Sequence, residues 1–336
     1  MKTINFIIWA NFLVIALISG MFLNCSVDTI LGQVILEADQ QAEPLFVLKN
    51  VRAITVSGTL SNPKWSTDGT KIAYESQYGI WVMDEDGSNL KQITTATGIG
   101  WSFAWMPGSE NIVYIYREYK RIEGRMNVTA FLQIVNIING DIKPVYSARY
   151  LQAPIVSSDG FIWTRSRDNR KNIMFDNTGN EFTGIKKEKI VFLNEEDELV
   201  LSNMDGTEEK VLSQDRIINF SLSPDGTHIV GDDIDWNIGI ITININSGST
   251  IELGEGNEPT WSPDGNYILY NISKDDGHRL LESELFVIKA DGTGKTQLTF
   301  TPDEIELHAS WSPDGKNIVY YSENSGRIFL ADIVKN

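Results

Sequence analysis

The stretch Trp261-Ser262-Pro263-Asp264-Gly265 occurs a second time, unchanged, at residues 311–315. Close variants stand at residues 65–69 (WSTDG) and 222–226 (LSPDG), and looser copies at residues 105–108 and 156–160. A stretch that returns at intervals of tens of residues indicates an array of equivalent units, each of which buries its apolar faces against its neighbours. We therefore expect a repeat fold.

The Ser-Pro-Asp-Gly part of this stretch predicts a tight turn. Serine suits the first position of a type I turn, proline presets φ at the second, aspartate bonds to its own backbone at the third, and glycine accepts a positive φ at the fourth. Such a turn joins two antiparallel strands. The residues after it alternate with a period of two, as in Ile72 and Tyr74 or Ile268 and Tyr270, which is typical of a strand.

Each unit continues with a third strand, a second turn such as Asp-Gly-Ser at residues 86–88, and a short fourth strand. Four antiparallel strands in about 40 residues form one blade of a β-propeller. Third strands indicate seven units, whereas first turns indicate six, because the unit at residues 186–213 has no such turn. The sequence therefore predicts an all-β, seven-bladed propeller of four-stranded antiparallel blades, with six blades as the alternative.

The two ends of the repeat region predict how the ring closes. The chain reaches Asn336 just after the third strand of the last unit, and a strand-like segment at residues 45–56 precedes the first tryptophan of the repeats. We expect this N-terminal strand to complete the last blade, because an unpaired sheet edge favours association with other chains.

The repeat resembles the bacterial WD40-like (PD40) repeat of the TolB family. The resemblance rests on Trp-Ser-Pro-Asp-Gly, the Ile-x-Tyr strand and residues 81–94 (WVMDEDGSNLKQIT), and it spans residues 58–332. It implies a β-propeller of the TolB type. Similar repeats also occur in peptidase-associated propellers and propeller lyases, so the resemblance leaves the function open.

Residues 1–25 are predicted to be a targeting segment. Lys2 gives a positive start, residues 12–18 are apolar, and Phe22-Leu23-Asn24-Cys25 resembles a lipobox, with Asn24 departing from the small residue usual there. We expect lipid attachment at Cys25, with an uncleaved anchor or a simple secretory signal as alternatives. All three place the protein outside the cytoplasm. Residues 26–44 then form a tether and residues 45–336 the propeller. With one cysteine the chain forms no internal disulfide.

Charge limits the partners. The net charge of −17 argues against nucleic acid, and we expect contact with a membrane only through the N-terminal lipid or anchor. A monomer with unknown envelope proteins as partners is expected. Charged insertions at residues 117–126 and 274–283 are candidate contact loops on one face. The two basic clusters are expected on a solvated rim and comprise Arg117, Lys120, Arg121 and Arg125, and Arg165, Arg167, Arg170 and Lys171.

No constellation of residues indicates catalysis, a cofactor or a metal. His228 and His278 are expected at turns, and His308 on an innermost strand near the channel. Residues 84–87 are interpreted as a turn rather than a calcium loop, and residues 232–235 as a solvated loop rather than a cation site. We expect a non-catalytic cell-envelope propeller that serves as a protein-interaction or ligand-binding scaffold. The alternative is a propeller lyase or hydrolase acting on a saccharide or peptide at the channel, for which His308 would have to converge with acids on a metal.

Overall fold

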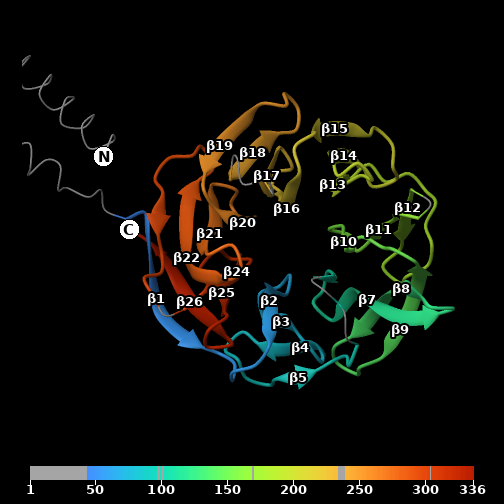
Figure 1. Ribbon diagram of the computed structural model, residues 1–336, viewed down its shortest axis with the longest axis horizontal. Helices are drawn as coiled ribbons and strands as arrows, with labels where there is room; N and C mark the ends of the chain where they lie inside the picture. Colours follow the sequence, from blue (N-terminus) through green and yellow to red (C-terminus); the bar gives the residue numbers. More distant parts are fainter. Residues whose placement is uncertain (1–43, 97–98, 100–101, 169, 234–238, 303) are drawn as a thin grey trace, which may run out of the picture. The chain divides into compact units, whose positions relative to one another are not determined.

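The computed structural model describes residues 44–336, apart from 97–98, 100–101, 169, 234–238 and 303. In these residues all regular structure is β, in seven antiparallel sheets that follow one another around a ring (Figure 1). The predicted seven-bladed propeller is confirmed, and the six-bladed alternative is wrong. The described part of the chain holds no helix long and apolar enough to cross a bilayer.

Blades 1, 2, 5 and 6 each use four consecutive strands, ordered from the channel outward (Figure 1). The bounds are β2 (Leu60–Trp65), β3 (Lys71–Ser76), β4 (Gly79–Asp84) and β5 (Lys91–Gln92) in blade 1; β6 (Phe103–Trp105), β7 (Asn111–Ile122), β8 (Arg125–Asn136) and β9 (Ile142–Ala148) in blade 2; β16 (Ile217–Leu222), β17 (His228–Asp233), β18 (Ile240–Asn244) and β19 (Thr250–Gly254) in blade 5; and β20 (Asn257–Trp261), β21 (Tyr267–Asp275), β22 (Leu280–Lys289) and β23 (Thr296–Gln297) in blade 6.

Blade 7 joins the two ends of the propeller. It contains β24 (Glu306–Trp311), β25 (Asn317–Ser322), β26 (Arg327–Lys335) and, as its outermost strand, β1 (Phe46–Ala53). β1 runs antiparallel to β26, with Phe46 opposite Lys335 and Ala53 opposite Phe329. The predicted closure of the ring by an N-terminal strand is confirmed, with a strand somewhat shorter than residues 45–56.

Blades 3 and 4 have three strands each: β10 (Ile155–Val156), β11 (Ile162–Ser166) and β12 (Lys171–Phe175), and β13 (Lys189–Leu193), β14 (Leu199–Asn203) and β15 (Lys210–Ser213). Four strands in every blade were expected. In blade 3 a single bridge between Phe175 and Glu181 stands where the fourth strand would be. In blade 4 the turn at residues 205–206 joins the last two strands, as the third-to-fourth turn does elsewhere. Blade 4 therefore lacks its innermost strand, which agrees with the missing first turn in its sequence.

The repeated motif folds as its residue types predict. The Ser262 hydroxyl accepts the N–H of Tyr267 at 2.9 Å, and the Ser262 carbonyl accepts the N–H of Gly265 at 2.9 Å. Gly265 has φ of +71°, where a side chain would be strained. The serines at residues 66, 223 and 312 make the same contacts with the backbone. The same serine-centred turn therefore precedes four of the seven second strands.

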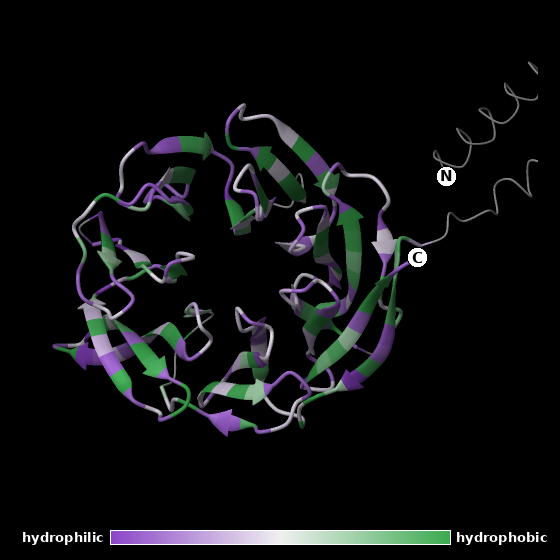
Figure 2. Cartoon of the chain, turned by 180° about the vertical axis from the view of Figure 1, so that it is seen from behind, coloured by the Kyte–Doolittle hydropathy of each residue, from purple (hydrophilic) through white to green (hydrophobic). Residues whose placement is uncertain are grey.

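Tryptophans of the inner strands fill the interfaces between blades. Each packs on a smaller apolar residue in the second strand of the preceding blade, and the pairs are Trp105 with Ala73, Trp261 with Val230, Trp311 with Leu269 and Trp65 with Val319. Figure 2 shows the strongly apolar residues gathered on the strands. The apolar core is therefore a series of layers around the ring, each shared by two blades.

The interface between blades 3 and 4 reverses this arrangement. Blade 4 has no inner strand and hence no inner tryptophan, and a tryptophan instead occupies the second strand of blade 3. This residue, Trp163, is 1% exposed and packs with Ile190 and Phe192 of β13. A large side chain on blade 3 thus replaces the apolar volume that the missing strand would have supplied.

The two charged insertions are hairpin extensions, not loops. Residues 117–122 of β7 pair with residues 125–130 of β8, and β21 and β22 remain paired out to Asp275 and Leu280. Glu123 and Gly124 between β7 and β8 both have positive φ, at 49° and 78°, which is the geometry of a two-residue hairpin turn. The expectation of loops was wrong because the backbone ladder continues through residues whose side chains are solvated.

Candidate functional site

A cavity of about 880 Å³ opens beside blade 4, within the ring. Its lining includes three runs of consecutive residues, namely 150–156 leading through β10, 188–193 along β13 and 219–222 in β16. Successive side chains of a strand point to opposite faces of its sheet, so a cavity that contacts every residue of a run lies along the strand edge. The cavity therefore includes the space where the innermost strand of blade 4 would stand, and it extends to Lys64 of blade 1 and Arg117 of blade 2.

The edge of β13 that faces this cavity carries backbone hydrogen-bonding groups. The Glu188 carbonyl accepts the N–H of Met204 at 2.8 Å, on the β14 side. Backbone groups of a strand alternate in direction, so those of Lys189, Val191 and Leu193 point toward the cavity. Gln152 Nε2 donates to the Leu193 carbonyl at 2.6 Å. No strand among the described residues pairs with this edge.

Cationic side chains from blades 1, 2 and 3 reach the same cavity. Lys64 Nζ donates to the Phe103 carbonyl at 3.0 Å and lies 4.8 Å from the centre of the Phe103 ring. Burial lowers the pKa of Lys64, and the charge of Glu75 opposes that shift. Arg117 donates to the carbonyls of Ile99 at 3.4 Å and of Leu151 at 3.3 Å.

The remaining charges of the lining are balanced by neighbours. Arg167 lies 3.4 Å from Asp197, Lys189 2.7 Å from Glu208, and Glu188 3.5 Å from Lys186. Lys64 and Arg117 form no ion pair with the part of the chain that the structure describes. The cavity wall is therefore cationic, in a chain whose net charge is −17.

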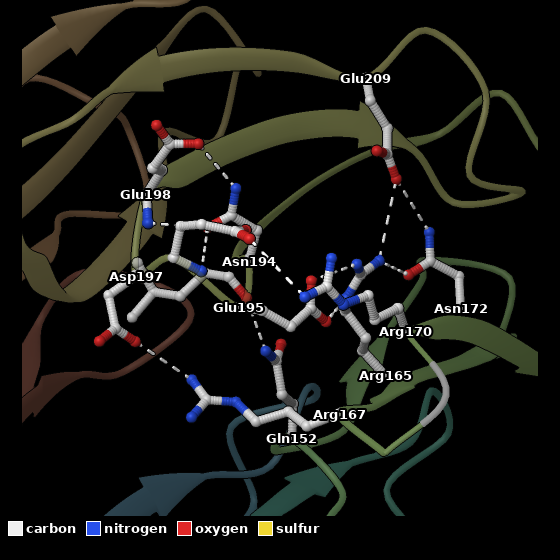
Figure 3. A network of polar contacts seen from close by, with 12 residues as sticks. Gln152, Arg165, Arg167, Arg170, Asn172, Asn194, Glu195, Asp197, Glu198 and Glu209 are labelled. Carbon is white, nitrogen blue, oxygen red and sulfur yellow. Dashed lines mark hydrogen bonds and ion pairs between the residues drawn. The ribbon is translucent and has the colours of Figure 1, made fainter.

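Arginines of blade 3 form ion pairs with the loop between β13 and β14 of blade 4 (Figure 3). Arg165 reaches both carboxylate oxygens of Glu195 at 3.1 Å, and its guanidinium lies 5.0 Å from the Phe192 ring. Hydrogen bonds from Arg165 hold the pKa of Glu195 below its usual range. Arg165 is 6% exposed, so the expectation of a solvated rim was wrong for this residue. Its partner is 30 residues away, which a reading of sequence clusters does not reveal.

A row of acids and one histidine lies on the two innermost strands of blade 5 and on the innermost strands of blades 6 and 7. The Asp232 carboxylate accepts Asn219 Nδ2 at 3.1 Å and the N–H of Glu258 at 3.4 Å. The Glu258 carboxylate in turn accepts the N–H of His308 at 2.8 Å, and His308 Nδ1 lies 2.8 Å from its other oxygen. Each acid therefore ties its blade to the next one around the ring.

One repeated bulge positions this row. Asn62, Asn219, Glu258 and His308 each precede the tryptophan position of the motif by three residues, and all four have φ between 47° and 54°. The strand register shifts at each of them. His308 was expected on an inner strand, whereas no role was predicted for Asn219 or Glu258. Alignment of the repeats on their Trp-Ser-Pro-Asp-Gly stretches would have placed all four together.

Residues 232–233 differ from expectation. Asp232 and Asp233 belong to β17 and are 4% and 7% exposed, so the predicted solvated loop was wrong at these two positions. The strand extends further because Asp233 and Asp232 pair across the sheet with Ile217 and Ile218. Burial raises the pKa of Asp232 to about 6, and the Asn219 hydrogen bond limits that rise. Ile234 and Asp235 lie outside the described residues.

The other predicted residues lie in turns, at the start of a strand or outside the described residues. Residues 84–87 form a turn in which Asp84 binds Lys71 and Asn89, as interpreted. His278 is exposed in a hairpin turn, and His228 starts β17 and contacts Thr227 and Asn244. Among the described residues, no three of the types His, Cys, Asp and Glu lie where they could hold a metal ion. Cys25, residues 1–25 and nearly all of the tether lie outside the described residues.

A buried acid at the start of β24 supports a stability prediction. Glu306 is 1% exposed, and burial raises its pKa to about 7, partly offset by bonds from Thr301 and Thr299. A carboxyl group that is protonated in the folded chain below pH 7, but only below about 4.5 when unfolded, stabilises the fold at low pH. This stabilisation is lost as pH rises through 7.

Glu306→Gln is therefore expected to raise the free energy of unfolding at pH 8 by roughly 2–3 kcal/mol and to change it little at pH 4. Urea unfolding of the full-length chain at both values measures this. Glu323→Gln, at an exposed position, is the control and should be neutral. An equal gain at both pH values would contradict the assignment of the ionised Glu306 as the destabilising group.

Comparison with known proteins agrees with the fold. The family model of the TolB β-propeller domain (PD40) matches residues 178–333. A search of the curated proteins gave no significant match.

Three solved structures illustrate the similarity. An oligogalacturonate lyase in complex with manganese shares 14% identity, with 87% of this chain and 97% of that chain covered and a TM-score of 0.56. A gluconolactonase from Xanthomonas campestris shares 12% identity, with coverage of 84% and 89% and a TM-score of 0.53. The β-propeller domain of Cps50 (Swd1) from Myceliophteria thermophila shares 11% identity, with coverage of 85% and 99% and a TM-score of 0.54.

At such identities these likenesses show a shared fold alone, because one fold carries many functions. The family match gives the more specific assignment. It includes blades 4, 5 and 6 and most of blade 7, and the Trp-Ser-Pro-Asp-Gly stretch is intact in blades 6 and 7. Together with the seven-bladed ring, it supports the interpretation of this chain as a TolB-like β-propeller.

Proposed function

We propose that this protein is a non-catalytic binding propeller of the cell envelope, which holds a protein or ligand in the cavity beside blade 4. The observation that carries the proposal is the omission of one inner strand, which leaves about 880 Å³ open within a rigid ring. A cavity of this size lies in the usual range for ligand sites. Trp163 and the Arg165–Glu195 pair maintain the blade interface beside it, so the opening is compatible with a stable fold.

Site-specific photo-crosslinking in intact cells tests this proposal. A photoreactive amino acid in place of Tyr150, which lines the cavity, is expected to capture a defined partner. The same amino acid in place of Tyr78, an exposed residue of the blade 1 hairpin, is the matched control. Equal capture from both positions would argue against the cavity as the binding site.

The enzyme alternative has a direct assay. Incubation of the purified chain with oligogalacturonate and manganese, followed by chromatography of the products, would reveal lyase activity. We expect the substrate to remain intact, because His308 is held by Glu258 and no metal-binding group of three occurs among the described residues. Cleavage that is lost in His308→Ala would replace the proposal with the enzyme reading.

We further propose that the protein is exported, lipidated at Cys25 and monomeric. Intact-mass measurement of the purified protein is expected to give a chain that begins at Cys25 and carries a diacylglyceryl group. Cys25→Ala should release the protein from the membrane fraction, because the lipid is attached through the Cys25 thiol. A transmembrane helix, by contrast, would anchor the protein without this thiol. Retention of Cys25→Ala in the membrane would favour the uncleaved anchor, and light scattering checks the monomer.

A further inference from the structure

We propose that the cavity takes an extended, acidic peptide segment of a protein partner, which pairs with β13 as the innermost strand that blade 4 lacks. The inference rests on the proposed function, in which this cavity is the binding site. It adds the chemical class of the partner and the mode of its binding. Four features of the cavity support it, namely its shape, its free backbone edge, its apolar walls and its charge.

The shape matches one strand. Neighbouring strands of a sheet lie about 4.8 Å apart, and a strand at that distance from β13 would pass through the cavity, between β10 and β16. The innermost strands of blades 5 and 6, β16 and β20, have six and five residues. A peptide of about this length would complete blade 4 to the form of its neighbours.

The edge of β13 offers the hydrogen bonds for such a strand. The N–H and C=O of Lys189 and Val191 point toward the cavity, and the Leu193 carbonyl is capped by the side chain of Gln152. Addition of a peptide strand to an exposed sheet edge is a common mode of recognition, in which the main chain supplies affinity and alternate side chains supply specificity. Gln152 would release Leu193 when the peptide binds.

The two walls of the cavity are apolar and suit apolar side chains on both faces of a strand. Blade 3 contributes Ile155 and Trp163, and blade 5 contributes Phe220 and Leu222. Inner strands elsewhere place one side chain against the preceding blade and the next against the following blade, as Trp261 does against Val230. Apolar side chains of the peptide would therefore be buried on both sides.

The charge of the cavity indicates that the polar side chains of the peptide are acidic. Lys64 and Arg117 line the cavity, donate to backbone carbonyls and form no ion pair within the described part of the chain. Carboxylates are the complementary groups, because charge-assisted hydrogen bonds to Lys and Arg are stronger than neutral ones. A basic peptide would meet repulsion here, which gives the test its sharpest contrast.

The first experiment uses a fluorescein-labelled heptapeptide with three central Val residues and two Glu residues at each end, so that apolar side chains face both walls, with the full-length protein in detergent. Anisotropy is expected to show saturable binding that weakens with salt, and no binding of the same peptide with Lys in place of Glu. Lys64→Gln combined with Arg117→Gln should weaken binding at least about tenfold. Lys91→Gln is the matched control, because Lys91 also donates to carbonyls of a neighbouring blade but lies outside the cavity.

The second experiment tests strand addition itself. Hydrogen exchange of the amides of Lys189 and Val191 is expected to slow on addition of the peptide and to remain unchanged with a peptide N-methylated at alternate residues. Lys189→Pro removes one of these donors at the first residue of an edge strand, a position that tolerates proline. Lys189→Pro should weaken binding of the peptide without lowering the Tm of the protein. If this variant is unstable, hydrogen exchange of the two amides in the wild-type protein decides the question.

The outcomes separate the inference from the proposed function. Equal binding of the Lys peptide, or binding without protection of the two amides, would overturn strand addition by an acidic segment. A peptide of residues 26–43 of the same chain gives a further outcome. If it protects these amides and the Glu peptide does not, strand addition by an acidic partner segment would also be overturned. In all three cases cavity-specific crosslinking at Tyr150 would still support the proposed function, whereas its loss would remove both.

Discussion

Replacing Phe46 by alanine is expected to destabilise the propeller by about 3–5 kcal/mol, the usual cost of deleting a buried aromatic side chain. Phe46 lies on β1, the strand that closes the ring, and is 7% exposed. Its ring centre lies 4.8 Å from that of Tyr267 in blade 6 and 6.3 Å from that of Trp311 in blade 7. The side chain therefore joins the first strand of the propeller to its last two blades.

Thermal unfolding of the full-length chain measures this effect, and a fall in Tm of roughly 6–15 °C is expected. Val51→Ala is the control, because Val51 belongs to the same strand but is 49% exposed, and it should change stability by less than about 0.5 kcal/mol. Similar values for both variants would show that packing of β1 contributes little and that its backbone pairing with β26 alone closes the ring.

Replacing Trp163 by alanine is expected to cost a similar 3–5 kcal/mol. In four of the other interfaces a smaller apolar residue meets a tryptophan from the next inner strand, whereas blade 4 supplies no such tryptophan. Removal of the Trp163 indole would leave a hole beside Phe192, whose ring centre is 5.2 Å away. Urea unfolding of the full-length chain measures the loss.

The informative comparison is Trp163→Val, which introduces the residue that stands at this position in blades 5 and 7. We expect Trp163→Val to recover only a small part of the stability lost in Trp163→Ala. Val230→Ala, by contrast, should cost less, since Trp261 covers the site. If Trp163→Val were as stable as the natural chain, the missing inner strand would need no compensation from blade 3.

Much of the fold could be predicted from the sequence because its signals are local. Ser, Pro, Asp and Gly in that order form a turn through bonds within five residues, as Ser262 and Tyr267 show. The alternation after each turn then places successive side chains in the interfaces with the preceding and the following blade, as Ile72 and Ala73 show. Even the gap in blade 4 left a trace, because the unit at residues 186–213 has no first turn.

Other features could not be predicted locally. The hairpin extension at residues 117–130 has charged side chains that suggested a loop, yet its backbone pairs along its full length. The burial of Arg165 depends on Glu195 in the next blade, and that of Asp232 on the continuation of β17. In each case the deciding partner is a backbone or a side chain that only the closed ring brings near.

The sequence alone thus determined the blade and the strand that closes the ring and favoured seven blades over six, since turn chemistry and period-two alternation act between near neighbours in the chain. Only the tertiary structure decided what surrounds the gap in blade 4. Lys64, Arg117 and the edge of β13 come from three different blades, and Glu258 meets His308 across 50 residues. Contacts of this kind depend on the angle at which one blade follows another, and that angle is set by packing throughout the ring.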